Sequence, residues 1–178
     1  MKKALVLFLI PLTFAACTGS NTSTPSAATQ DSSSAAAVSL PYTASYSSNF
    51  VPGKQSDVAT VLNSYKDWET NDMKAMRATF GDSIKMEFSS GYVINNTGDS
   101  MVNMAAKFRD SLSKVELTIY AWTPNHSVDK NEDWVNVWYK EIDTYKKGKV
   151  DSAEYEDDNL LKNGKIVYVS SHSKKLKK

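Results

Sequence analysis

The sequence predicts one α+β domain in which helices pack on an antiparallel sheet. Apolar residues recur at helical spacing between residues 56 and 112, and they alternate with polar residues from 115 to 171. Two turn sequences, Lys147-Gly148-Lys149 and Asn163-Gly164, divide the alternating half. Because such turns join antiparallel strands in hairpins, the second half is expected to form the sheet.

Three helices are expected in the first half of the domain. The first opens at Ser56-Asp57, a capping hydroxyl followed by an acid, and Trp68 lies near the edge of its apolar stripe. Asn71-Asp72 interrupts it and caps a second helix, which is ended by Gly81 and carries Met73, Met76 and Phe80. The third is capped by Asp99 or Ser100, and its expected buried stripe is Met101, Met104, Ala105, Phe108 and Leu112.

The strands follow from period-two alternation. A short strand is expected at 83–88, and longer ones at 115–122, 134–145, 150–158 and 165–171. Residues 95–98 are expected to form a turn, and residues 123–133 a loop. The acidic residues near 154–158 are expected at a solvated strand end.

The strand at 134–145 carries large apolar groups on both faces. One face holds Val135, Val137 and Tyr139, and the other holds Trp134, Asn136 and Trp138. A sheet with one wet face should alternate more cleanly. We therefore expect helices to cover one face, and either a partner subunit or a small molecule held in a cone of sheet and helices to account for the other.

The N-terminus has the pattern of an export signal. Met1-Lys2-Lys3 precedes a short apolar run, and small residues precede Cys17. The stretch Phe14-Ala15-Ala16-Cys17 resembles a lipobox, although Phe14 departs from its usual aliphatic residue. We therefore expect a signal peptide at 1–16 and lipidation of Cys17, the sole cysteine. Thr18, which follows it, points to the outer membrane facing the periplasm, with surface display as an alternative.

Residues 17–50 are expected to form a flexible tether, and 51–178 the folded domain. The tether is dominated by Ser, Thr, Ala, Pro and Asn, and it contains too little apolar surface to offset the entropy of ordering. Removal of Lys2 and Lys3 with the signal leaves 19 basic and 20 acidic residues. That balance provides no positive field for nucleic acid.

Four segments together resemble the NTF2-like cone, with the SnoaL-like subgroup nearest. They are Val61-Leu62-Asn63-Ser64-Tyr65-Lys66-Asp67-Trp68, Phe80-Gly81-Asp82-Ser83-Ile84, Trp134-Val135-Asn136-Val137-Trp138 and Leu161-Lys162-Asn163-Gly164-Lys165-Ile166-Val167. The resemblance implies N-terminal helices packed on a curved antiparallel sheet. This fold contains isomerases, cyclases, dehydratases, epoxide hydrolases and non-enzymatic binders, so it does not define a function by itself.

No catalytic group follows from the motifs. Against the isomerase pattern, the position of the general base falls on Phe88, which cannot accept a proton. Asp82 is expected to be a turn acid, Tyr65 a core residue with its hydroxyl satisfied, and His126 an exposed loop residue. No spacing indicates a metal site or a cofactor.

The leading hypothesis is a lipid-anchored, non-catalytic domain of the cell envelope that binds an apolar small molecule or a protein partner. An apolar pocket is expected from Tyr65, Trp68, Phe88, Met104, Trp122 and Trp138, and these aromatic groups equally suit a core or a homodimer interface on the sheet face. The alternative is a SnoaL-like lyase, isomerase or hydrolase acting on a small hydrophobic substrate, with Asp82, Tyr65 and His126 as its first candidates. An acid or histidine inside the cone, within hydrogen-bond reach of a tyrosine, would favour the enzyme.

Overall fold

The computed structural model describes residues 39–176, so the expected signal peptide, Cys17 and most of the tether lie outside the described residues. Within that range no helix is long and apolar enough to cross a membrane. The helices are α1 (Gln55–Thr70), α2 (Met73–Thr79) and α3 (Gly98–Arg109). The strands are β1 (Phe50–Pro52), β2 (Phe80–Phe88), β3 (Val93–Thr97), β4 (Leu112–Ser127), β5 (Glu132–Tyr145), β6 (Val150–Lys162) and β7 (Lys165–Lys175).

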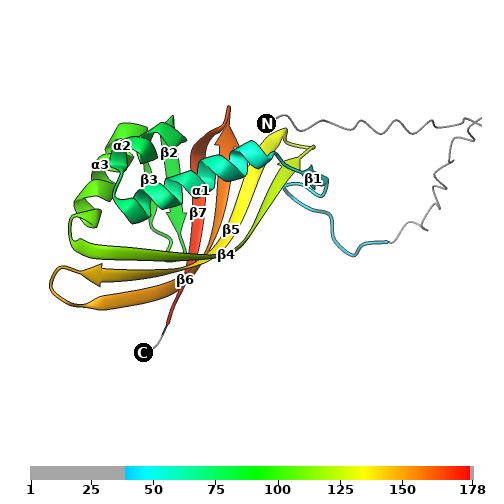
Figure 1. The fold of residues 1–178 in the computed structure, drawn as a ribbon. Coiled ribbons are helices and arrows are strands. Elements are labelled where there is room, and N and C mark those ends of the chain that lie inside the picture. The colour runs from blue at the N-terminus through cyan, green and yellow to red at the C-terminus, as the bar shows by residue number, and fades with distance from the viewer. Residues whose placement is uncertain (1–38, 177–178) are drawn as a thin grey trace, which may run out of the picture. The chain divides into compact units, whose positions relative to one another are not determined.

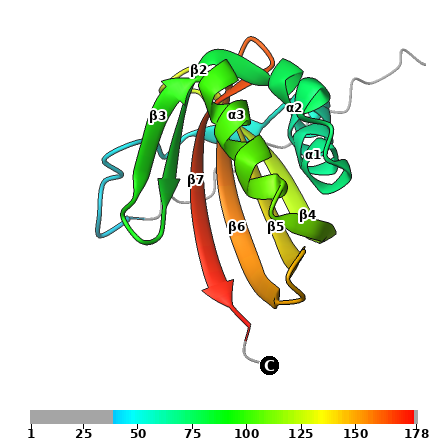
Figure 2. The same ribbon diagram turned by 90° about the vertical axis from the view of Figure 1, so that its left-hand side faces the viewer.

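The strands form one curved sheet of seven in the order β1-β4-β5-β6-β7-β2-β3 (Figure 1). The three helices pack on one face of it, as Figure 2 shows, so the expected α+β cone is confirmed. The sheet is mixed rather than purely antiparallel, because β2 pairs with β7 in parallel. This pairing brings together the first long strand and the last, which the sequence separates by the rest of the domain.

The core lies between α1 and the middle of the sheet. Val61 of α1, Val135 and Val137 of β5 and Ile84 of β2 are completely buried. Tyr139 is also buried, so the expected helix-covered face of β5 is confirmed. The opposite face is covered in part by the chain itself. Tyr46 packs edge-on against Trp134, and Trp134 Nε1 donates to Tyr46 Oη at 3.1 Å.

The helix boundaries follow local capping chemistry with two corrections. Asn71 is left-handed and ends α1, and the Asp72 carboxylate accepts from Ala75 N at 2.9 Å, both at the expected break. Ser56 is not a cap, since α1 begins one residue earlier, after Lys54. Thr97 caps α3, in place of Asp99 or Ser100, because its hydroxyl accepts from Ser100 N at 3.2 Å.

The sheet is larger than the alternation predicted. Phe80 opens β2 rather than closing the second helix, and residues 93–97 form β3 instead of a turn. Their pairing with neighbouring strands provides hydrogen bonds that outweigh the local turn preference of Asn95-Asn96. Most of the expected loop at 123–133 is strand for the same reason, since 123–127 and 132–133 pair across the β4–β5 hairpin.

The two hairpin turns lie where the sequence predicts them. Gly148 has a φ of 85°, and Asn163 and Gly164 have φ values of 52° and 70°. Two consecutive positive φ angles are what a type I′ turn requires, and Asn-Gly adopts them at low cost. These turns fix the register of β5, β6 and β7, and thereby decide which side chains face the helices.

Candidate functional site

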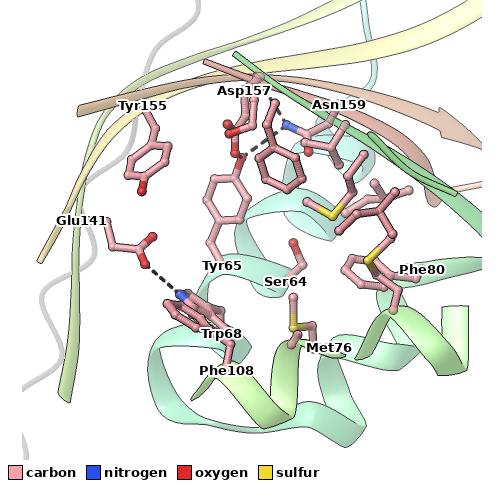
Figure 3. A pocket seen from close by; sticks show the side chains of 18 of the residues that line it. Ser64, Tyr65, Trp68, Met76, Phe80, Phe108, Glu141, Tyr155, Asp157 and Asn159 are labelled. Carbon is pink, nitrogen blue, oxygen red and sulfur yellow. Dashed lines mark hydrogen bonds between the residues drawn. The ribbon is translucent and has the colours of Figure 1, made fainter. Parts of the chain in front are cut away.

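A cavity of about 570 Å³ lies between the helices and the concave face of the sheet (Figure 3). Its volume is typical of small-molecule sites, which range from about 300 to 1,000 Å³. Much of its wall is apolar and comes from α2, α3, β2 and β3. This part of the wall is formed by Met76, Phe80, Met86, Phe88, Ile94, Met101, Met104 and Phe108.

The polar groups of the cavity lie on the sheet, on strands β5 and β6. Successive side chains of a strand point to opposite faces, so the odd-numbered residues of β5 and β6 turn toward the helices. They contribute Tyr139, Glu141, Tyr155, Asp157 and Asn159 to the lining. On β6, Asp157 and Asn159 are buried, while Glu156, which precedes them and points to the opposite face, is exposed.

Asp157 is the centre of a buried hydrogen-bond cluster. Its Oδ2 accepts from Tyr65 Oη at 2.8 Å and from Tyr139 Oη at 3.0 Å. Asn159 Nδ2 donates to Tyr65 Oη at 3.3 Å and to the carbonyl of Val135 at 3.1 Å, which fixes the position of the Tyr65 hydroxyl. Figure 3 shows Tyr65 reaching from α1 across the cavity toward Asp157. An acid therefore lies inside the cone within hydrogen-bond reach of two tyrosines.

Burial controls the protonation of this cluster. Burial raises the pKa of Asp157, and hydroxyl groups of Ser171, Tyr65 and Tyr139 oppose that rise. Burial also raises the pKa of both tyrosines well above its usual range, with Asp157 adding to the effect, so they are donors at any physiological pH. Asp157 Oδ1 is buried without a hydrogen bond of normal geometry to any described residue. A buried oxygen without such a bond is uncommon in native proteins, and Oδ1 can therefore accept a further hydrogen bond.

Glu141 is the second acid of the cavity. Trp68 Nε1 donates to its Oε1 at 3.1 Å, from α1. Burial and the nearby Asp143 raise the pKa of Glu141 to about 8, so its carboxyl group holds a proton at neutral pH. Burial raises the pKa of Asp143 as well, while the hydrogen bond with Glu141 and the charge of Arg109 oppose that rise. The two acids therefore influence each other's protonation on the inner face of β5.

The structure brings four of the six expected pocket residues together. Tyr65, Trp68, Phe88 and Met104 all line the cavity. Met104 and Phe108 were expected to be fully buried, but they are 40% and 47% exposed, because the stripe of α3 faces the cavity instead of a filled core.

Trp122 and Trp138 do not line the cavity. Trp138 lies between Val137 and Tyr139, both buried under the helices, so strand alternation directs it to the opposite face. Trp122 lies on β4 beyond Leu117, the residue by which that strand reaches the cavity, and it is 47% exposed.

Two of the three candidate catalytic residues are also outside the cavity. Asp82 is exposed at the start of β2. His126 lies on β4 rather than in a loop, and its Nδ1 is 2.8 Å from Asp133 Oδ1. Tyr65 alone lies in the cavity. Among residues 39–176, no three His, Cys, Asp or Glu side chains converge as metal ligands would.

The residues that sequence reasoning missed are Asp157, Glu141 and Tyr139. The acidic run near 154–158 was expected at a solvated strand end, but the strand continues to Lys162 and Asp157 is only 4% exposed. The available signal was the alternation of Ala153, Tyr155, Asp157, Asn159 and Leu161. Its polar members made it resemble a surface, although all five turn toward the helices.

No protein-family model and no curated protein sequence matches this chain. Solved structures do match its fold. An LEH-like epoxide hydrolase from M. tuberculosis has a TM-score of 0.57 at 12% identity, over 67% of this chain and 84% of that one. An NTF2-like protein of unknown function from Exiguobacterium sp. 255-15 has a TM-score of 0.54 at 17% identity, over 65% of this chain and 98% of that one. AusH from Aspergillus nidulans has a TM-score of 0.55 at 13% identity, over 70% of this chain and 87% of that one.

These likenesses define the class of fold: the domain is an NTF2-like α+β cone. At such low identities they extend to the fold alone. The function of this chain must therefore be argued from its own cavity.

Proposed function

We propose that the cone binds a small, mainly apolar molecule and acts on it by acid–base chemistry, as a lyase, isomerase or hydrolase. The observation that carries this proposal is Asp157, an acid inside the cavity that accepts hydrogen bonds from Tyr65 and Tyr139. A proton-transfer site needs a titratable group held in place by rigid elements. Here Asp157 is held by its own strand of the sheet and by Tyr65 of α1. The LEH-like epoxide hydrolase demonstrates that a cone of this shape accommodates hydrolysis.

The two acids of the cavity suit complementary roles. Glu141 is protonated at neutral pH and can donate a proton to a substrate. Asp157 accepts the tyrosine hydrogen bonds on Oδ2, which leaves Oδ1 as the atom able to take a proton or orient a polar group of the substrate. Burial raises the pKa of both acids, but three hydroxyl groups oppose the rise at Asp157, whereas Asp143 adds to the rise at Glu141. Environments that act differently on two acids favour one of them as the proton donor and the other as the acceptor.

A second candidate function is binding without catalysis. It is favoured by the internal satisfaction of Asp157 Oδ2, since a carboxylate already bonded to two tyrosines also serves as a structural support for the cavity wall. In that case the apolar wall retains the ligand and the acids only select its polar group.

One experiment separates the two functions. The protein purified from its own host is examined by native mass spectrometry for a retained small molecule, and then incubated with a small-molecule extract of that host. We expect the wild type to consume at least one compound that Asp157→Asn and Glu141→Gln leave unchanged, while Glu156→Gln, on the outer face of β6, behaves as the wild type. A retained ligand with no consumed compound would eliminate the enzyme and leave the binder.

We further propose that the domain is held in the cell envelope by lipid on Cys17, and that it pairs with a second copy through the outer sheet face. The sequence before Cys17 supports the anchor. Trp138 and the exposed Tyr120 support the interface, because both are aromatic groups outside the core. Cys17→Ser should move the protein from the membrane fraction to the soluble fraction, and native mass spectrometry reports the dimer.

A further inference from the structure

Among the described residues, the cavity contains acids without any base to neutralise them. Two of its lining residues, Glu141 and Asp157, carry carboxyl groups, and no Lys, Arg or His of residues 39–176 lines it. Asp143, the next inward position on β5, adds a third acid beside Glu141. The cation near this end is Arg109, whose guanidinium donates to the backbone carbonyls of Trp68, Glu69 and Leu112, and is therefore engaged outside the lining.

Aromatic rings surround the same acids. Tyr139 stacks on Tyr155 with ring centroids 5.0 Å apart, and Trp68 stacks on Phe108 at 6.1 Å. All four rings line the cavity, and Trp68 directly holds Glu141. Aromatic rings attract cations through their electron-rich faces, most strongly where water is excluded. Rings combined with carboxylates form a site for an organic cation.

The energetics favour a cation over a neutral or anionic ligand. An acid in an apolar wall is costly to ionise because no opposite charge balances it, and burial accordingly raises the pKa of both Glu141 and Asp157. A bound cation supplies the missing charge and stabilises the ionised carboxylates, whereas a bound anion supplies no balancing charge and is tolerated only while the carboxyl groups keep their protons. A neutral ligand gains the apolar contacts alone.

We propose that the cone selects lipophilic amines: molecules whose apolar body lies against the methionine and phenylalanine wall and whose protonated nitrogen lies between Asp157 and Glu141. This inference rests on the proposed function, since it names the ligand class of the same cavity. The apolar wall sets the size of the body, and the two acids set the charge of the head.

The test uses three probes with one apolar body: decylamine, decanol and decanoate. Their affinities for the purified protein are measured by calorimetry at pH 7 and low salt, below the concentration at which they aggregate. We expect decylamine to bind at least ten-fold more tightly than decanol, and decanoate to bind most weakly. Glu141→Gln and Asp157→Asn should each reduce the ratio of decylamine affinity to decanol affinity several-fold.

Glu156→Gln is the matched control, because it removes one acid from the outer face of the same strand, next to Asp157. It should retain the full amine preference. A preference that falls in Glu156→Gln and persists in both cavity variants would reflect attraction to the surface and overturn the inference. If a cavity variant does not fold, the comparison of the three probes on the wild type still decides.

The outcomes separate this inference from the proposed function. Equal binding of decylamine and decanol refutes the amine preference while the cavity stands as an apolar ligand site. If none of the three probes binds, the ligand site itself fails, and the proposed function fails with it.

Discussion

The protonation of Glu141 should make the stability of the domain fall as the pH rises. The pKa of Glu141 is raised from 4.5 to about 8 in the folded protein, so the folded state holds this proton more tightly than the unfolded state. An acid with a raised pKa contributes most stability below its unfolded pKa and loses it between the two values. The loss begins near pH 4.5, is complete above pH 8, and amounts to about 5 kcal/mol in the limit.

The variant Glu141→Gln isolates this effect. Glutamine retains the shape and can still accept from Trp68 Nε1, but it does not titrate. Urea unfolding of wild type and variant, followed by circular dichroism from pH 4 to pH 9, gives the difference in the free energy of unfolding at each pH. We expect the variant to become more stable than the wild type as the pH rises, with the difference changing by about 5 kcal/mol across the range.

The wild type and the variant must be compared with each other because the pKa values of Asp143 and Asp157 are also raised. These two acids likewise make the free energy of unfolding fall as the pH rises. Glu156→Gln on the outer face should give a difference that hardly varies with pH. A wild-type-minus-variant difference for Glu141→Gln that stays within about 1 kcal/mol from pH 4 to pH 9 would show that this acid is not buried among the other acids.

Four further variants test the packing around the site by urea unfolding. Arg109→Met should lower the free energy of unfolding by about 2–4 kcal/mol, because the guanidinium caps the last carbonyls of α1. The control is Lys107→Met, at an exposed position of α3, which should change the free energy of unfolding by less than about 0.5 kcal/mol. Gly98→Ala should lower the free energy of unfolding by about 1–3 kcal/mol, since its Cβ would lie 2.4 Å from the Gly81 carbonyl oxygen. The control is Asn103→Ala, on the exposed side of α3. If the two variants lowered the free energy of unfolding equally, the clash at Gly98 would be contradicted. Tyr65→Phe and Tyr139→Phe should each lower the free energy of unfolding by about 1–2 kcal/mol. Their effects should combine non-additively, because both hydroxyls donate to Asp157 Oδ2. Strict additivity in a double-mutant cycle would refute a shared acceptor.

Whether the site could be foreseen differs from one residue to the next. Tyr65, Trp68, Phe88 and Met104 were predicted in the cavity because size and apolarity alone direct such residues inward. Asp157 was not, because the sequence alone does not reveal that a strand rich in acids has one face under helices. Once the face is known, the alternation along β6 assigns Asp157 and Asn159 to the inside and Glu156 to the outside.

The sequence by itself determined the features that depend on neighbours along the chain. The helix stripe of α1, the break at Asn71-Asp72, the Asn163-Gly164 turn and the two faces of β5 all follow from spacings of two to four residues. The expected lipid anchor at Cys17 is likewise a local pattern, and it remains a prediction.

Only the tertiary structure decided the features that join distant segments. The parallel pairing of β2 with β7, the strand β3 in place of a turn, and the packing of Tyr46 on Trp134 each depend on a partner far along the chain. The acid cluster belongs to the same group, because Tyr65 and Asp157 lie 92 residues apart and meet only when α1 crosses the sheet. Burial then changes the protonation of Asp157 and Glu141, and burial is a property of the folded surroundings rather than of the residue.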